Sequence, residues 1–201
     1  MLNKFVDKTA RKPSGWIGKR MLSNPRAHYK FFRWSLDKLQ LKPDDTFLEI
    51  GCGGGVLLNM ALETVKHAKA IDHSSDMVQI AKEKNQKALS EGRVEIVLGN
   101  AESLPWDDNS FTCATANQMF FFIEKPMIVL KEFYRVLKPG GRLVITSTED
   151  SILPKLLFVL WSHSMRLYKN SDMEYMLKQA GFQTVEVENV ERLIQLSYAE
   201  K

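Results

Sequence analysis

The chain has 201 residues, of which 44% are hydrophobic and 26% charged, so one globular domain with a substantial core is expected rather than a disordered chain. The longest apolar stretch, residues 152–161, is interrupted by Pro154 and Lys155 and is too short to span a bilayer, and the basic N-terminus lacks the apolar segment of a signal peptide. Cys52 and Cys113 have no metal-ligand spacing, so no metal site and a reducing, cytoplasmic setting are expected.

The net charge of +4 is unevenly distributed. Residues 1–42 hold 11 Lys/Arg against 2 Asp/Glu, which leaves 17 against 22 in the remainder. A basic arm on a mildly acidic body can meet nucleic acid, an anionic membrane or the carboxylate of a cofactor. Composition by itself favours a plain solvated surface over any of these.

The first element in chain order is an arm followed by a helix. Residues 1–24 show little periodicity, and Asn24-Pro25 is typical of a helix start, so we predict a helix from there to about Gln40. Strands and helices then alternate. The expected strands are 46–50, 69–72, 94–98, 111–116 and 142–147, and the expected helices cover about 57–65, 74–88 and 126–137. This order predicts an α/β fold with a doubly wound, mostly parallel sheet and helices on both faces.

The last third of the chain differs in pattern. Residues 152–168 are apolar and expected to be helical, and Ser171 to Glu174 has the pattern of a capping box that opens a further helix, which Gly181 ends. Residues 184–190 and 193–199 alternate like strands and predict an antiparallel pair at the sheet edge. With the five parallel strands they make a seven-stranded sheet with an antiparallel edge strand.

A glycine run follows the first strand and leads into a helix. Glu49 is followed by Gly51, Cys52 and Gly53, and then by two more glycines, in the spacing Glu-x-Gly-x-Gly-x-Gly. Glycines here let backbone N–H groups and a ligand approach each other without side-chain obstruction. The carboxylate ahead of them disfavours a dinucleotide phosphate, whereas a ligand with sulfonium and ammonium groups tolerates it.

The ends of the second, third and fourth strands carry further polar residues. Asp72, at the tip of the second strand, can accept hydrogen bonds from both hydroxyls of a ribose. These strand ends are also followed by the polar residues His73, Asn100, Glu102 and Asn117 and by the apolar Met77 and Ala101. For Met77 the competing interpretation is ordinary core packing, and for His73 a solvent-facing loop.

Taken in order, these segments resemble the class I S-adenosylmethionine-dependent methyltransferases, particularly the small "type 11" and ubiquinone-biosynthesis-like group. The similarity covers about residues 46–148 and includes Gly99 to Trp106, which resembles the family's Gly-Asp-Ala-Glu-x-Leu-Pro-Phe, and Arg135 to Gly141, a helix-to-strand turn. The resemblance implies a Rossmann-like fold. This chain departs from the family pattern at Asn100 and Thr112, where aspartate is usual.

The resemblance also assigns roles to residues. Gly51, Cys52 and Gly53 would form the floor beneath the methionine part of S-adenosylmethionine (SAM), with Glu49 behind it, and Asp72 would bind the ribose. His73 and Met77 would flank ribose and adenine, residues 100–102 would line the adenine, and Asn117 would lie beneath the transferring methyl group. His28 could contact the cofactor carboxylate. We accordingly expect two parts in one domain. Residues 1–45 are an arm and helix that cover the cofactor, and residues 46–201 are the SAM-binding methyltransferase domain.

Because the sulfonium of SAM is already a strong electrophile, positioning and exclusion of water can supply most of the acceleration of an in-line displacement. We therefore assign no catalytic residue, and we expect Cys113, inside an apolar strand, to be a core residue.

Three functions remain open. The first is methyl transfer to a small-molecule acceptor, with S-adenosylhomocysteine (SAH) as the product; residues 120–123 and 152–161 could line a pocket for an apolar acceptor or belong to the core. The second, less favoured, is an RNA methyltransferase that grips nucleic acid with its basic arm. The third is a non-catalytic SAM-binding module. The sequence identifies neither the acceptor nor the oligomeric state.

We also expect the segment from Lys12 to Trp34 to fold over the cofactor as a lid, because it combines glycine, histidine and tryptophan residues with positive charge directly before the cofactor-binding strand.

Overall fold

The centre of the computed structural model, which describes residues 28–148, 150, 165–191 and 194–201, is a seven-stranded sheet in the order β3-β2-β1-β4-β5-β7-β6. Its strands are β1 (Thr46–Ile50), β2 (His67–Asp72), β3 (Val94–Leu98), β4 (Phe111–Asn117), β5 (Leu137–Thr148), β6 (Thr184–Asn189) and β7 (Ile194–Glu200). The pairs from β3 to β5 are parallel, and β7 is antiparallel to both β5 and β6. The predicted doubly wound α/β fold is confirmed, with β7 as the antiparallel strand and β6 outermost.

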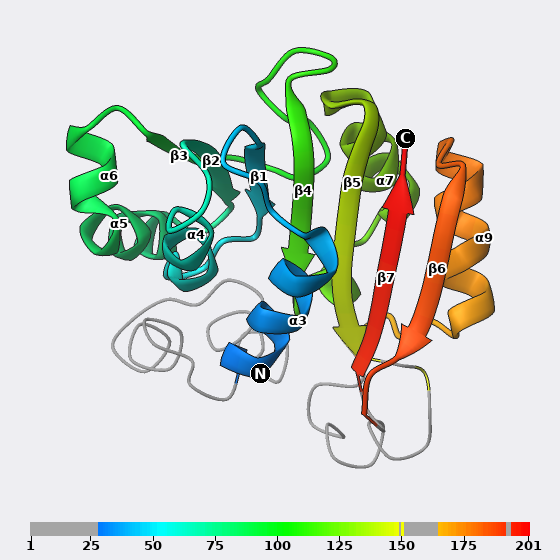
Figure 1. The fold of residues 1–201 in the computed structure, drawn as a ribbon. Coiled ribbons are helices and arrows are strands. Elements are labelled where there is room, and N and C mark those ends of the chain that lie inside the picture. Colours follow the sequence, from blue (N-terminus) through cyan, green and yellow to red (C-terminus); the bar gives the residue numbers. More distant parts are fainter. Residues whose placement is uncertain (1–27, 149, 151–164, 192–193) are drawn as a thin grey trace, which may run out of the picture.

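Helices lie on both faces of this sheet (Figure 1). They are α3 (Tyr29–Leu39), α4 (Val56–Ala61), α5 (Ser75–Lys84), α6 (Gln86–Ser90), the short 3-10 helix η3 (Phe120–Phe122), α7 (Pro126–Val136) and α9 (Asn170–Ala180). Three predicted helix ends are confirmed. The Ser74 hydroxyl caps α5 by accepting from the N–H of Met77, Pro126 opens α7, and Gly181 ends α9 in the left-handed conformation.

Several predicted boundaries are wrong. The helix expected over residues 74–88 breaks at Asn85, because the Asn85 side-chain amide donates to the carbonyls of Ala81 and Gly55. The capping box at Ser171 is not formed: α9 begins at Asn170, and its N-cap, Lys169, makes no side-chain cap hydrogen bond.

The apolar helix expected over residues 152–168 does not include residues 165–168, which the structure shows to be non-helical. Here the backbone makes long-range hydrogen bonds instead, from the N–H of Arg166 to the carbonyl of Phe121 (2.7 Å) and from the N–H of Asp150 to the carbonyl of Tyr168 (3.2 Å). Residues 152–164 of that expected helix, residues 24–27 of the expected N-terminal helix, and the arm itself lie outside the described residues.

The sheet separates two apolar cores because successive strand residues face opposite sides. On one side Leu48 and Ile50 belong to a cluster with Phe133 of α7. On the other side Phe47 belongs to a cluster with Leu57 of α4. Burying each such side chain contributes about 1.5–3 kcal/mol, so the central strand is fixed by packing from both faces.

Helix α3 crosses the sheet on the α4 side, running antiparallel to β4 and β5 (Figure 1). At the C-terminal cap of α3 the Gln40 carbonyl accepts from Arg142, which pairs with Cys113 near the amino end of β4. In the middle of the helix Ser35 donates to Asn117, the last residue of β4 (2.5 Å). The N-terminal end of α3, which begins after His28, therefore lies towards the carboxyl edge of the sheet, about 10 Å along the helix axis from Ser35.

The opposite, amino edge holds a buried ion pair. Asp45 binds Arg142 (2.6 Å) and also accepts from the hydroxyl of Thr112 (2.6 Å) and the backbone N–H of Lys42 (2.7 Å). Burial by itself would raise the pKa of Asp45, but these hydrogen bonds and the Arg142 charge outweigh it and lower that pKa. Thr112, which departs from the family pattern, therefore has a structural role here as the partner of Asp45.

Candidate functional site

The sequence-predicted positions gather at the carboxyl edge of the parallel strands. Strands β2 and β4 both pair with β1, so chain connections leave β1 towards one half of the sheet and β4 towards the other. In open α/β sheets, the crevice outside such a switch point is where ligands bind. Here it lies between the glycine loop after β1 and the turn after β4.

The glycine loop follows the last residue of β1. Gly51 and Gly55 both have φ of +71°, and a Cβ on either residue would lie 2.7 Å from a neighbouring side chain, Met119 or Asn85. Gly53 also has a positive φ, +49°, but a Cβ there would meet no described atom within 4 Å. Packing therefore requires glycine at 51 and 55, whereas Gly53 exposes bare backbone to open space.

Asp72 connects this loop to the end of β2. Its side chain is buried, with one carboxylate oxygen accepting from the N–H of Gly53 (2.8 Å) and the other from the N–H of Ser74 (2.9 Å). A carboxylate has about four lone-pair sites, so two remain for a ligand. His73 is half-exposed, with Nδ1 3.6 Å from the Asp72 carboxylate.

Glu49 lies fully buried near the same loop. Burial raises its pKa well above the ordinary value, the negative charge of Asp72 raises it further, and a hydrogen bond from the backbone of Leu58 opposes both. Its second oxygen, Oε2, is buried without a hydrogen-bond partner in the described structure. A buried, unpartnered carboxylate oxygen is costly, and a cationic ligand group would relieve that cost.

The loop after β3 holds Asn100, Ala101 and Glu102. The Asn100 side-chain oxygen accepts from the N–H of Glu102 (3.0 Å), so this oxygen already closes a turn within the loop. Ala101 is buried in the core, and Glu102 pairs with Lys125 (3.2 Å). The loop also reaches the end of β2, because the N–H of Gly99 donates to the carbonyl of Asp72 (3.0 Å).

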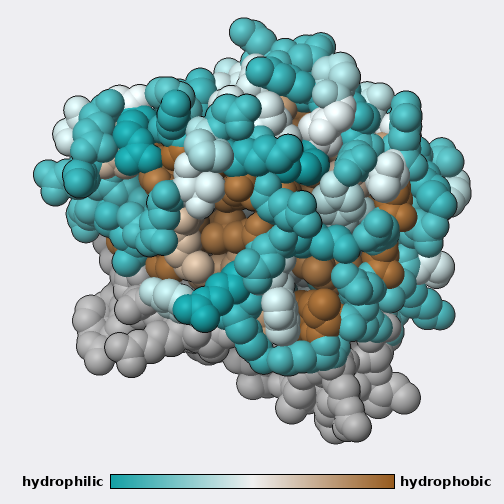
Figure 2. Space-filling model, in the orientation of Figure 1, coloured by the Kyte–Doolittle hydropathy of each residue, from teal (hydrophilic) through white to brown (hydrophobic). Residues whose placement is uncertain are grey.

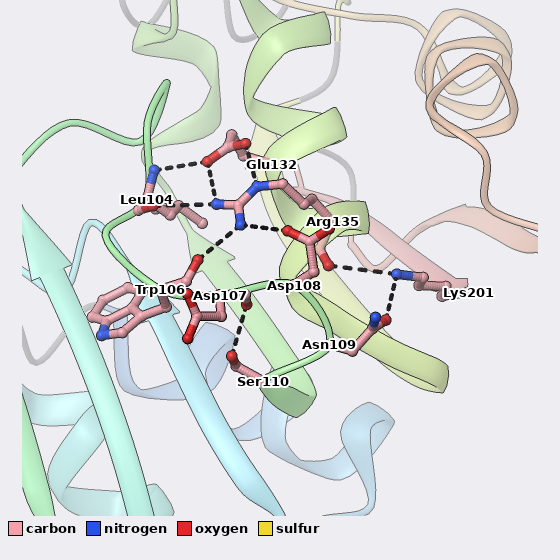
Figure 3. A network of polar contacts seen from close by, with 9 residues as sticks. All are labelled: Leu104, Trp106, Asp107, Asp108, Asn109, Ser110, Glu132, Arg135 and Lys201. Carbon is pink, nitrogen blue, oxygen red and sulfur yellow. Dashed lines mark hydrogen bonds and ion pairs between the residues drawn. The ribbon is translucent and has the colours of Figure 1, made fainter.

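A guanidinium clamp fixes the remainder of this loop against α7 (Figure 3). Arg135 donates to both carboxylate oxygens of Glu132 (2.7 and 2.8 Å) and to the carbonyls of Trp106 (2.8 Å) and Leu104 (3.2 Å). Glu132 in turn accepts from the N–H of Leu104 (2.8 Å), and Asp108 also pairs with Arg135 (2.9 Å). We expected only a turn from this segment, and the clamp shows how the loop is held.

We predict that Arg135→Ala lowers the free energy of unfolding by about 2–3 kcal/mol, because it leaves two loop carbonyls and Glu132 without their charged donor. Arg135→Lys should recover only part of the loss, since an ammonium cannot reproduce the planar fork. Urea unfolding measures both. Lys131→Ala, at an exposed position on the same helix, is the matched control; an equal loss there would contradict the role of the clamp.

Three other sequence candidates lie outside the loops after β1, β2 and β3. Met77 is 1% exposed and behaves as a core residue. His28 contacts the rings of Phe31 and Phe32, and burial lowers its pKa. Asn117 is buried, and its side chain is held by other protein side chains.

Two residues at the crevice were missed by the sequence analysis as individual candidates. Met119 forms the wall opposite Gly51, and Gln118 before it adopts a left-handed backbone (φ +52°), which is uncommon for a non-glycine residue. Their place directly after β4 was the available signal. Ser35 of α3, which contacts Asn117, had none, because it is one of many serines in the chain.

Neither cysteine has the environment of a nucleophile. Both are buried, and burial raises the pKa of Cys113 to about 12 and that of Cys52 well above its ordinary value. The expectation of a core role for Cys113 agrees with this geometry.

Comparison with known proteins identifies the central part of the chain. Residues 48–145 match the family model described as "Methyltransferase domain". The chain is 33% identical over 129 residues to a demethylmenaquinone methyltransferase of Oceanobacillus iheyensis, covering 63% of this chain and 54% of that protein. It is 31% identical over 159 residues to the demethylmenaquinone methyltransferase of Staphylococcus aureus, covering 74% and 65%. The chain thus spans about half to two thirds of the length of these curated relatives.

Solved structures share the fold at lower identity. Phosphoethanolamine N-methyltransferase 2 of Haemonchus contortus, in complex with S-adenosyl-L-methionine, aligns with a TM-score of 0.81 at 17% identity, covering 100% of this chain and 60% of that one. A SAM-dependent methyltransferase of Thermotoga maritima aligns with a TM-score of 0.67 at 23% identity, covering 91% and 97%. In the part of the chain that the structure describes, no helix combines the length and apolar character needed to cross a membrane.

Proposed function

Residues 48–145 belong to the class I SAM-dependent methyltransferases, and from this premise we propose that the chain transfers a methyl group from SAM to a small, apolar acceptor. The observation that carries the proposal is the arrangement at the crevice. The open backbone of Gly53 is bonded to the Asp72 carboxylate (2.8 Å), and a buried Glu49 with an unpartnered oxygen lies near the same loop.

These residues fit the three chemically distinct parts of SAM. Asp72 would accept from the ribose hydroxyls with the lone pairs that Gly53 and Ser74 leave open. Gly51 and Gly53 would border the methionine part, and the negative field of Glu49 would favour its ammonium group. The loop from Asn100 to Glu102 would border the adenine, where the Asn100 oxygen keeps one lone pair besides its bond to the N–H of Glu102.

When bound, SAM supplies a methyl group that is already activated by the sulfonium. The chain's own residues then have two tasks, which are to hold the acceptor in line with that methyl group and to exclude water. Methylation of the acceptor also releases a proton, which passes to solvent or to a base, and we assign no residue to that role.

An aromatic cluster follows Met119, in which Phe120 and Phe121 are buried and the partly exposed Phe122 and Tyr168 would face an apolar acceptor. Phe121 and Phe122 contact each other with ring centroids 4.6 Å apart, and Phe120 contacts Tyr168 at 6.1 Å. Burial raises the pKa of Tyr168 from its ordinary value of 10.0, further from neutral pH, where the phenol is protonated in any case. Two of the relatives are demethylmenaquinone methyltransferases. We therefore propose a quinol-type ring as the acceptor class.

Titration calorimetry with SAM, SAH and NAD tests the donor site, and transfer of labelled methyl from SAM to demethylmenaquinol tests the acceptor. We expect heat with SAM and SAH, none with NAD, and label in the quinol. Binding of NAD without SAM would overturn the donor site. Labelling of RNA but not of quinol would favour the alternative that the basic N-terminal arm grips RNA, and SAM binding without transfer to any acceptor would favour a non-catalytic module.

A further inference from the structure

A buried network of polar side chains joins α3 to the ends of β4 and β5, behind the turn that carries Met119. Asn117 is its centre. Its side-chain oxygen accepts from the hydroxyls of Ser35 (2.5 Å) and Thr146 (2.9 Å), and its amide nitrogen donates to the hydroxyl of Thr115 (2.7 Å). Ser35, Thr115 and Thr146 are each 0% exposed, and Asn117 is 8% exposed.

The direction of each hydrogen bond in this network follows from the hydroxyl of Thr115. The Thr115 hydroxyl donates to the carbonyl of Val144 (2.8 Å), so towards Asn117 it can only accept. The Asn117 amide must therefore point its nitrogen at Thr115 and its oxygen at Ser35 and Thr146, which both donate. Aspartate at 117 would lack the donor that Thr115 needs and would bury a charge.

The network controls the conformation of the turn after β4. Asn117 is the last residue of β4, and Gln118 immediately after it has a left-handed backbone whose N–H donates to the carbonyl of Thr146 (2.9 Å). Left-handed backbone in a non-glycine residue persists only where the surroundings over-determine it. This turn places Met119 against Gly51, so close that a Cβ on Gly51 would lie 2.7 Å from the Met119 side chain.

The network also locates α3. Apolar contacts between a helix and a sheet have no preferred direction, whereas a buried hydroxyl that must meet one acceptor specifies the position of the helix. Ser35 is that hydroxyl, because it is the α3 residue that bonds Asn117. The same bond fixes α3 and the wall of the crevice at once.

We propose that Ser35 and Thr146 are positioning residues for SAM: by holding Asn117 they keep the Gln118 turn and the Met119 wall in place, so that α3 strengthens cofactor binding without touching the cofactor. This inference rests on the donor site proposed above. Asn117 accordingly acts through its neighbours rather than as a ligand of the methyl group.

The test compares Ser35→Ala and Thr146→Val with wild type by calorimetry with SAH and by thermal unfolding. Each variant removes one of the two donors to Asn117, and we expect SAH binding to weaken about tenfold in each, at a temperature where both remain folded. Thr146→Ser, which keeps the hydroxyl, should restore wild-type affinity. Ser197→Ala is the matched control, because this buried hydroxyl has no hydrogen-bond partner among the described residues, so its removal should neither weaken SAH binding nor destabilise the fold.

A purely structural network would lower the unfolding temperature of Ser35→Ala and Thr146→Val and leave the SAH affinity of the folded variants unchanged; that result would overturn the inference. Affinity losses in Thr146→Ser as large as in Thr146→Val would overturn it as well, since the hydroxyl would then be irrelevant. If the wild type itself binds no SAH, the proposed donor site fails first and the inference falls with it, so the two failures are distinguishable.

Discussion

Gly53→Ala is expected to weaken SAH binding by about 100-fold or more while the protein stays folded. Gly53 has a positive φ, so alanine costs about 1 kcal/mol in backbone strain, but no described atom lies within 4 Å of the added Cβ, so nothing clashes in the protein alone. The methyl group would instead enter the space in which we propose the methionine part of the cofactor to lie. Calorimetry with SAH measures the affinity, and urea unfolding measures the strain.

Gly140→Ala is the matched control for this experiment. Gly140 has a φ of +73°, and a Cβ there also meets no described atom within 4 Å. It lies near the start of β5, at the opposite edge of the sheet from the crevice. The two variants should therefore lose similar stability, while only Gly53→Ala loses SAH affinity. Equal affinity in both would show that Gly53 does not border the cofactor.

Glu49→Gln is expected to stabilise the folded protein at pH 8 and to weaken SAH binding about 10- to 100-fold. Burial and the nearby Asp72 charge raise the pKa of Glu49 above its ordinary value of 4.5, so the folded state holds this proton more tightly than the unfolded state does. Between the two pKa values the folded chain carries more bound protons, and its stability therefore falls as the pH rises. Glutamine removes that loss, which is about 1.4 kcal/mol for each unit of pKa difference.

The affinity of Glu49→Gln falls because the amide no longer provides a negative charge for the cofactor's ammonium group, and a hydrogen bond to a charged partner is worth about 1.5–3 kcal/mol. Urea unfolding at pH 5 and pH 8 measures the first effect, and calorimetry with SAH the second. The difference should be smaller at pH 5 than at pH 8 and vanish well below pH 4.5, where Glu49 is protonated in both states.

Asp45→Asn provides a control of opposite sign for Glu49→Gln. The hydrogen bonds to Asp45 and the Arg142 charge lower the pKa of Asp45 below its ordinary value of 3.8. Its carboxylate therefore stabilises the fold above that pH and loses the effect as the pH falls through the lowered pKa. Asp45→Asn should destabilise at pH 8 and leave SAH affinity unchanged, since this pair lies at the amino edge. If Glu49→Gln also destabilises at pH 8, Glu49 has a partner in solution that the structure lacks.

The sequence by itself determined that seven strands alternate with helices along the chain and form a mostly parallel sheet, because strand periodicity, glycine runs and helix caps are local signals. Strands β1 and β3 have the predicted bounds, and the Ser74 cap and the Gly181 helix end are where the pattern places them. The glycine run after β1 and Asp72 after β2 could be named from their places at strand ends, whereas the residues after β3 were named from the family resemblance. In parallel strands that share an edge, the loops after successive strands must meet.

The tertiary structure decided what these residues contact. Asn100 bonds its own loop, Met77 is core, and Asn117 is held by Ser35 and Thr146, which lie 82 and 29 residues away along the chain. The Arg135 clamp likewise joins residues 27 to 31 apart. Such pairings depend on how α3, α7 and the loops pack on the sheet. Local sequence patterns cannot specify them, because the residue type of a serine or an arginine does not indicate which distant group it will contact.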